Sequence, residues 1–211
     1  MSIKSTVKKI LNRMNYSKIL MYHHVSDPPE LQCSGCLIST KRFMQSVSDY
    51  SNYTDIYSAI RKNKKGYTAI TFDDGLHDEY TVAYPFLKEQ NIPFTVFIVF
   101  DFIGKPGYIT KEELIELAND PLVTIGGHGL THNVLKGMPF AKQQEEIISS
   151  TKQLEQIIEK KIDIFAYSHG QFDKNTVKIM KQFRYGFTAG GGNLNFIKKI
   201  NRYALPRIGV E

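Results

Sequence analysis

Residues 67–75 read Tyr-Thr-Ala-Ile-Thr-Phe-Asp-Asp-Gly, a short apolar run that ends in two adjacent carboxylates. The run Tyr67–Phe72 is rich in β-branched and aromatic residues, a composition that favours a strand. Adjacent carboxylates at the end of a buried strand repel each other and lose solvation unless a cation meets one of them. Because side chains alternate along a strand, one Asp can bind a metal while the other stays free as a base. The alternative is a solvated pair that caps the following helix.

Six further apolar runs are predicted as strands, and helical patterns separate most of them. The predicted strands are Ile19–Val25, Pro93–Phe100, Leu122–Ile125, Ile162–Tyr167, Tyr185–Thr188 and a last one near Tyr203–Ile208. The predicted helices cover residues 77–90, 111–119 with Thr110 as N-cap, 139–160 and about 173–183. This alternation predicts an α/β protein with a parallel sheet of seven strands, covered by helices on both faces. A chain of 211 residues without an evident linker fits a single domain.

Residues 2–15 form a separate amphipathic pattern. Apolar side chains at helical spacing face lysines on the opposite side, which predicts an N-terminal helix over residues 1–16 ahead of a domain over 17–211. Such a helix either lies on anionic lipid or packs on the domain. The lysines interrupt the apolar residues, so a secretory signal is not expected, and no apolar run is long enough to cross a membrane. These features predict a cytoplasmic protein that can touch the inner membrane surface.

The charge of the chain does not indicate a nucleic-acid-binding protein. The net charge is +6 and the pI about 9.1. A basic surplus suits nucleic acid, anionic lipid or an acidic glycan. However, the sequence contains no zinc finger, Arg-rich helix or aromatic-basic RNA motif. We therefore expect no nucleic-acid partner.

Polar residues follow most of the predicted strands. The residues concerned are His23 and His24, Asp73 and Asp74, His128, Ser168 and His169, and Arg207. In barrels and in open parallel sheets, the carboxyl ends of the strands share one face of the domain. We therefore expect these ionisable side chains to converge on one site, although they come from distant parts of the chain.

His128-Gly129-Leu130-Thr131-His132 supplies two imidazoles at positions i and i+4. On a helical turn these would face the same way at about 6 Å, which suits one metal ion. Gly126 and Gly127 are expected to let the backbone bend into that turn. Two imidazoles with one carboxylate suit zinc best, and cobalt, nickel or iron also fit. Three protein ligands leave open positions on the metal, as in a catalytic site.

These motifs, taken in order, resemble the polysaccharide deacetylase family, carbohydrate esterase family 4, also called the NodB-homology domain. The matching segments are 71–75 (Thr-Phe-Asp-Asp-Gly), 127–132 (Gly-His-Gly-Leu-Thr-His), 165–170 (Phe-Ala-Tyr-Ser-His-Gly), 22–25 (Tyr-His-His-Val) and 205–208 (Leu-Pro-Arg-Ile). The resemblance implies a distorted (β/α) barrel of seven strands. It implies that Asp74, His128 and His132 bind one divalent metal and that Asp73 is the catalytic base.

The third motif and the C-terminal segment depart from the family pattern. Ala166 stands where many members have an Arg that pairs with the base, and Arg207 is expected to supply that charge. Ser168 and His169 replace the usual Pro and Tyr. No C-terminal Leu-x-His motif provides the family's general acid, so His169 is the preferred substitute and His23 the other candidate. Tyr167 and His23 are assigned to substrate binding.

The sequence therefore predicts a metal-dependent hydrolase that removes N-acetyl groups from an amino-sugar-containing glycan or glycan precursor. One alternative is a hydrolase of O-acetyl esters or of other non-peptide C–N bonds on the same scaffold. Another is a non-catalytic relative that binds sugar and keeps the metal site.

Overall fold

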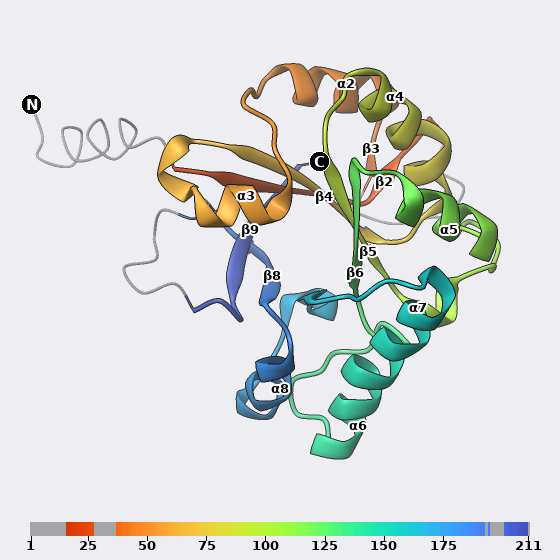
Figure 1. The fold of residues 1–211 in the computed structure, drawn as a ribbon, viewed down its shortest axis with the longest axis vertical. Coiled ribbons are helices and arrows are strands. Elements are labelled where there is room, and N and C mark those ends of the chain that lie inside the picture. The colour runs from red at the N-terminus through yellow and green to blue at the C-terminus, as the bar shows by residue number, and fades with distance from the viewer. Residues whose placement is uncertain (1–15, 28–36, 193, 195–200, 211) are drawn as a thin grey trace, which may run out of the picture.

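Seven parallel strands close into a barrel in the computed structural model, which describes residues 16–27, 37–192, 194 and 201–210 (Figure 1). In barrel order the strands are β1 (Lys18–Tyr22), β4 (Thr68–Asp74), β5 (Phe94–Ile98), β6 (Val123–Gly127), β7 (Ile164–Ala166), β8 (Tyr185–Gly191) and β9 (Leu205–Gly209). The predicted single-domain barrel of seven strands is confirmed.

The barrel is closed by its first and last strands. On one side β1 pairs with β4, with Met21 opposite Thr71, and on the other side it pairs with β9, with Leu20 opposite Ile208. All pairs are parallel, so the carboxyl ends of the strands gather at one end of the barrel. The first predicted strand is divided at His23. Beyond it, β2 (His24–Val25) leaves the barrel and pairs with β3 (Leu37–Ile38).

The outer helices include all those predicted. They are η2 (Glu79–Ala83) with α4 (Tyr84–Glu89), α5 (Lys111–Asn119), α6 (Phe140–Gln144) with η4 (Glu145–Ser149) and α7 (Ser150–Ile158), and α8 (Lys174–Ile179) with η6 (Met180–Gln182). Thr110 caps α5 as predicted: its hydroxyl accepts from the Glu113 N–H, and the Glu113 carboxylate accepts from the Thr110 N–H. In Figure 1, α4, α5 and α7 lie along one side of the barrel.

Two helices were not predicted. α2 (Thr40–Ser48) begins after Ser39 and α3 (Ile56–Arg61) after Asp55, and each of these residues accepts a backbone N–H as an N-cap. Short 3₁₀ turns add η1 (Asn63–Lys65), η3 (Phe100–Phe102) and η5 (Ser168–Gly170). η3 and η5 follow β5 and β7 directly, so they lie at the carboxyl ends of those strands.

Apolar side chains fill the barrel and the layer outside it. Helix α3 packs against β1 and β4 and places its buried residues beside the inner side chains of the barrel. That cluster consists of Ile19, Ile56, Ala59, Ile60, Ala69, Phe97, Ile164, Ala166, Phe187, Leu194 and Leu205. A larger cluster lies between the strands and the helices α2, α4, α5 and α7. The polar groups of the site therefore rest on a packed apolar core.

The predicted N-terminal helix over residues 1–16 lies almost wholly outside the described residues. Over the part of the chain that the structure describes, none of the helices has the length and apolar character needed to cross a membrane.

Gly126 lies close against an aromatic ring inside the barrel. A Cβ placed there would lie 2.4 Å from the ring of Phe97, so only glycine fits beside that ring. Gly126 and Gly127 were expected to bend the chain, but they lie within β6, and neither has a positive φ. They are needed because aromatic rings approach the strand, since a Cβ at Gly127 would lie 2.8 Å from Phe165.

Gly126→Ala is expected to lower the free energy of unfolding by about 1–3 kcal/mol, because the new methyl group overpacks the barrel. Phe97→Leu in the same chain should recover part of that loss by making room. Urea unfolding of both single variants and the double variant measures the effect. Strictly additive losses would contradict the proposed clash.

Candidate metal centre and active site

Asp74, His128 and His132 meet at the carboxyl end of the barrel. Asp74 is the last residue of β4, His128 follows β6, and His132 lies four residues further on. Asp74 Oδ1 is 3.4 Å from His128 Nε2 and 3.2 Å from His132 Nε2. One ligand atom from each residue lies within 4.8 Å of the other two. Ligands bound tetrahedrally at about 2.0–2.1 Å would be roughly 3.3 Å apart, so these separations suit one ion.

The protonation states of these groups also favour a cation. His128 Nδ1 lies 2.8 Å from the Ala166 carbonyl oxygen, which can only accept, so Nδ1 carries the proton and Nε2 presents a lone pair. Burial lowers the pKa of His132 to about 4, which leaves its ring neutral at pH 7. Asp74 Oδ1 is buried without a hydrogen-bond partner among the described residues. Lone pairs that face a carboxylate oxygen repel it, and a cation between them turns that repulsion into attraction.

The two histidines are not on a helical turn as predicted. Residues 128–132 form a loop in which Gly129 has φ +103° and His132 has φ +64°. The left-handed backbone at these positions turns the His132 ring back toward His128, so the ring centroids lie 5.1 Å apart. The spacing i, i+4 thus brings the imidazoles together through a different backbone path from the one we expected.

Asp73 points into the barrel and pairs with Arg207 from β9. Arg207 Nη1 lies 2.6 Å from Asp73 Oδ1 and Nη2 lies 2.6 Å from Oδ2, a bidentate pair. Both side chains are almost fully buried. Arg207 Nε also donates to the Thr188 carbonyl at 2.9 Å, and its guanidinium lies over the Phe97 ring. The predicted contact between Arg207 and Asp73 is therefore present.

This pair controls the charge state of Asp73. Burial alone would raise the pKa of the carboxyl, but the Arg207 guanidinium and the nearby His128 hold that pKa well below its usual range. Asp73 therefore stays ionised at neutral pH. Its Oδ2 lies 3.8 Å from His128 Nε2, so the ionised carboxylate adjoins the candidate metal ligands.

The two candidate proton donors lie on opposite loops. His23 is half-buried after β1, and its imidazole is near enough to influence the pKa values of Asp73, Asp74 and His132. His169 is exposed in η5 with φ +55°, and its ring centroid lies 4.6 Å from that of His132. His169 Nε2 lies 3.2 Å from the His132 carbonyl oxygen, to which it must donate.

The position of Tyr167 does not fit the substrate contact that we predicted for it. The side chain is fully buried, its hydroxyl donates to the Tyr203 carbonyl at 2.6 Å, and its ring stacks on Phe172. It packs in the apolar cluster that contains Phe165 and Met180. Tyr167 therefore supports the η5 loop from below instead of facing a ligand.

Three polar residues near the site, Asp78, Glu79 and Glu146, were not selected from the sequence. His24 Nδ1 lies 2.7 Å from Asp78 Oδ2, and both side chains are buried. Glu79 is buried, and its carboxyl oxygens have no hydrogen-bond partner among the described residues, so burial raises its pKa well above the usual value. Glu146 contacts the 128–132 loop. Asp78 and Glu79 lie four and five residues after Asp74, a proximity that could have drawn attention to them.

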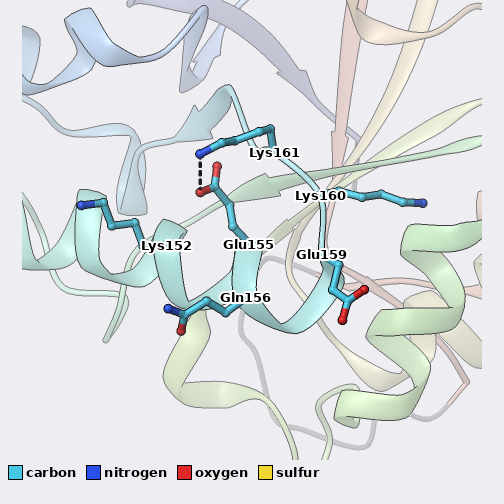
Figure 2. A pocket seen from close by; sticks show the side chains of 6 residues that line it. All are labelled: Lys152, Glu155, Gln156, Glu159, Lys160 and Lys161. Carbon is cyan, nitrogen blue, oxygen red and sulfur yellow. Dashed lines mark hydrogen bonds and ion pairs between the residues drawn. The ribbon is translucent and has the colours of Figure 1, made fainter.

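A groove far from these residues has a different character. It lies on α7 and the turn that follows, and Figure 2 shows that only charged and amide side chains line it. The Lys161 ammonium lies 3.1 Å from the Glu155 carboxylate there. Because α7 leads into the start of β7, this groove lies toward the opposite end of the barrel from the metal ligands.

The family model described as polysaccharide deacetylase matches residues 60–188, which include the candidate metal ligands and Asp73. The chain belongs to the polysaccharide deacetylase family. A relative named as a polysaccharide deacetylase, YxkH of Bacillus subtilis (strain 168), is 29% identical over 205 residues, covering 92% of this chain and 71% of that protein. A poly-beta-1,6-N-acetyl-D-glucosamine N-deacetylase of Staphylococcus aureus (strain MRSA252) is 28% identical over 154 residues. That match covers 66% of this chain and 52% of the relative, so the chain spans about half of its length.

Solved structures of deacetylases share the fold. The Streptococcus pyogenes deacetylase PplD in complex with acetate has a TM-score of 0.79 at 21% identity, with 92% of both chains covered. The polysaccharide deacetylase BC0361 from Bacillus cereus has a TM-score of 0.80 at 21% identity, covering 92% of this chain and 65% of that one. At this level of identity, the structural likeness shows that this chain has the same barrel fold as these deacetylases.

Breaking the Asp73–Arg207 pair from one side is expected to cost more stability than removing both charges. Arg207→Met leaves a buried carboxylate without its partner and should lower the free energy of unfolding by about 3–5 kcal/mol. Asp73→Asn together with Arg207→Met should recover part of that loss, because no uncompensated charge remains. Urea unfolding of the single and double variants gives the coupling energy.

The exposed pair Arg42–Asp49, 3.5 Å apart, provides a matched control. Its double-mutant cycle should give a coupling energy of roughly 0–1 kcal/mol. An equally small value for Asp73–Arg207 would contradict the proposed role of the buried pair.

Proposed function

We propose that this protein removes N-acetyl groups from an amino-sugar-containing glycan or glycan precursor, with one divalent metal held by Asp74, His128 and His132. The observation that carries the proposal is the meeting of three metal-ligating atoms with the ionised Asp73 carboxylate at the carboxyl end of a deacetylase-family barrel. The ligand set of two imidazoles and one carboxylate favours zinc, with cobalt, nickel or iron as alternatives.

A bound metal would polarise the acetyl carbonyl and lower the pKa of water nearby. The rest of the chemistry falls to the side chains. Asp73 accepts a proton from the attacking water, whose oxygen forms a new bond to the acetyl carbon as the C–N bond breaks. Because Arg207 stabilises the ionised form of Asp73, the carboxyl then gives that proton up, through solvent, to the histidine that has protonated the leaving nitrogen, and both side chains return to their starting states. The nitrogen leaves as an amine after it receives a proton, and acetate is the second product.

The donor of the proton to the amine is proposed to be a histidine. His169 was preferred from the sequence, yet it is exposed and its Nε2–H is engaged by the His132 carbonyl. His23 is half-buried and acts electrostatically on both Asp73 and Asp74. These observations favour His23 as the proton donor, with His169 at the rim of the site as the second candidate.

The substrate class rests on the relatives. The Staphylococcus aureus relative is named for deacetylation of poly-beta-1,6-N-acetyl-D-glucosamine, which supports an N-acetylated amino sugar here. The same site chemistry would also release acetate from an O-acetyl ester, since both reactions pass through attack on an acetyl carbon. Acetate release from matched N-acetylated and O-acetylated oligosaccharides separates the two activities.

Asp73→Asn is expected to lower the rate of acetate release by at least about 100-fold, because it removes the proton acceptor. The variant should still bind zinc, since Asp74 and both histidines remain. Zinc content after dialysis and acetate release from N-acetylglucosamine oligomers provide the two measurements. Asp49→Asn, at an exposed carboxylate that follows α2, is the matched control and should keep full activity.

Full activity in Asp73→Asn would exclude the proposed role of the carboxylate. Zinc bound by the wild-type protein without turnover on N-acetylated or O-acetylated glycans would favour a sugar-binding protein that has kept the metal site.

Replacing the true proton donor is expected to change the pH dependence of kcat. A donor must be protonated, so deprotonation with rising pH produces the alkaline limb of the profile. His23→Gln should lower kcat by about 10²–10⁴-fold and remove that limb. His169→Gln should keep the limb and change mainly KM. The reverse result would assign proton donation to His169, and two unchanged profiles would rule out both.

A further inference from the structure

One carboxylate holds the loop between the two histidine ligands. The backbone N–H groups of Leu130 and Thr131 both donate to Glu146 Oε2, at 2.9 and 3.0 Å. The Thr131 hydroxyl donates to the other oxygen of the same carboxylate. Three donors from two successive residues, midway between His128 and His132, therefore converge on Glu146.

The helix that carries Glu146 is irregular at this position. Glu146 lies in the π-helical segment η4 (Glu145–Ser149), between α6 and α7. A π segment inserts an extra residue into a helix and is frequent at functional sites. Glu146 is buried, whereas Glu145 next to it is exposed and pairs with Lys142 at 2.7 Å. Two adjacent glutamates thus have entirely different surroundings.

The loop itself needs support from outside. His132 has φ +64°, a conformation that costs a non-glycine residue roughly 1–2 kcal/mol and persists only where neighbouring groups enforce it. The carbonyl oxygens of Gly129 and Leu130 accept from the N–H groups of Phe100 and Asp101 in η3, at 3.0 and 2.9 Å. Glu146 binds the N–H groups of the same loop, so the loop is held on both its donor and its acceptor groups.

Close packing beneath the loop leaves little freedom for the carboxylate. A Cβ at Gly129 would lie 3.1 Å from Glu146 Oε2 and 3.3 Å from Ser168 Oγ. The Ser168 hydroxyl in turn donates to the His128 carbonyl at 2.9 Å. Glu146 therefore sits in a confined space directly under the turn that orients the histidine rings.

We propose that Glu146 is a positioning residue of the metal centre, which fixes His132 relative to His128 and Asp74 by binding the loop between the histidines. The carboxylate does not reach the metal ligands itself, so its effect on the metal passes through the loop backbone. The catalytic relevance of this role rests on the proposed function, whereas the effect on metal binding does not.

Cobalt titration of the apoprotein tests the proposal, because Co²⁺ bound by imidazole and carboxylate gives visible absorption bands that report its geometry. Glu146→Ala should raise the Kd for Co²⁺ by about 10–100-fold, the usual effect of losing a group that orients a metal ligand. Glu146→Gln keeps an oxygen for the two N–H groups and should raise Kd less. Glu145→Gln is the matched control and should leave Kd and the bands unchanged.

A purely structural role predicts a different pattern. In that case Glu146→Gln would lower the free energy of unfolding of the apoprotein, measured in urea, while its Kd for Co²⁺ and its absorption bands stayed at wild-type values. This outcome would overturn the proposal. Under the proposal, excess metal should also restore most of the lost activity in Glu146→Ala. Wild-type protein that binds Co²⁺ but lacks turnover, with Kd still raised in the variants, would refute the proposed function alone.

Discussion

The buried pair between Asp73 and Arg207 is the interaction on which the site depends. A carboxylate inside an apolar barrel would otherwise be protonated, and a neutral carboxyl can neither attract a metal nor accept a proton from water. Arg207 donates from both terminal nitrogens of its guanidinium to the two oxygens of this carboxylate. The guanidinium is itself held by the Thr188 carbonyl and by the Phe97 ring. The charge of Asp73 is thus set by the strand that closes the barrel.

The loops at the carboxyl end of the barrel place the other groups of the site beside this charge. Asp74 adjoins the paired carboxylate on β4, while the two histidines come from a loop that has little regular structure of its own. η3 and η4 compensate by binding the backbone of that loop. Precision in this part of the molecule therefore comes from hydrogen bonds contributed by neighbouring helices, while the strands provide the rigid base.

The strands were predictable because most of the barrel strands are buried on both faces and appear as short apolar runs, and the predicted convergence of polar residues at their ends followed from topology alone. The helices α2 and α3 were missed, although Ser39 and Asp55 offered cap signals. The helical turn predicted for residues 128–132 and the substrate contact predicted for Tyr167 differ from the structure for the same reason. The positive φ of His132 and the inward direction of Tyr167 depend on local backbone paths that residue spacing does not reveal. Glu146 looked like any glutamate of an amphipathic helix, because a π segment changes the helix face without a clear mark in composition.

The position of Arg207 in the chain has a consequence for how the protein forms. Its partner Asp73 lies 134 residues earlier, so the ion pair cannot form until β9 has been synthesised. A chain that contains β4 through β8 but not β9 carries the Asp73 carboxylate without its Arg207 partner. Contacts of such long sequence separation also slow folding, because the entropy of closing the intervening loop is lost before the stabilising contact forms. Closure of the barrel by β9 and completion of the charged centre are therefore a single event in the folding of this domain.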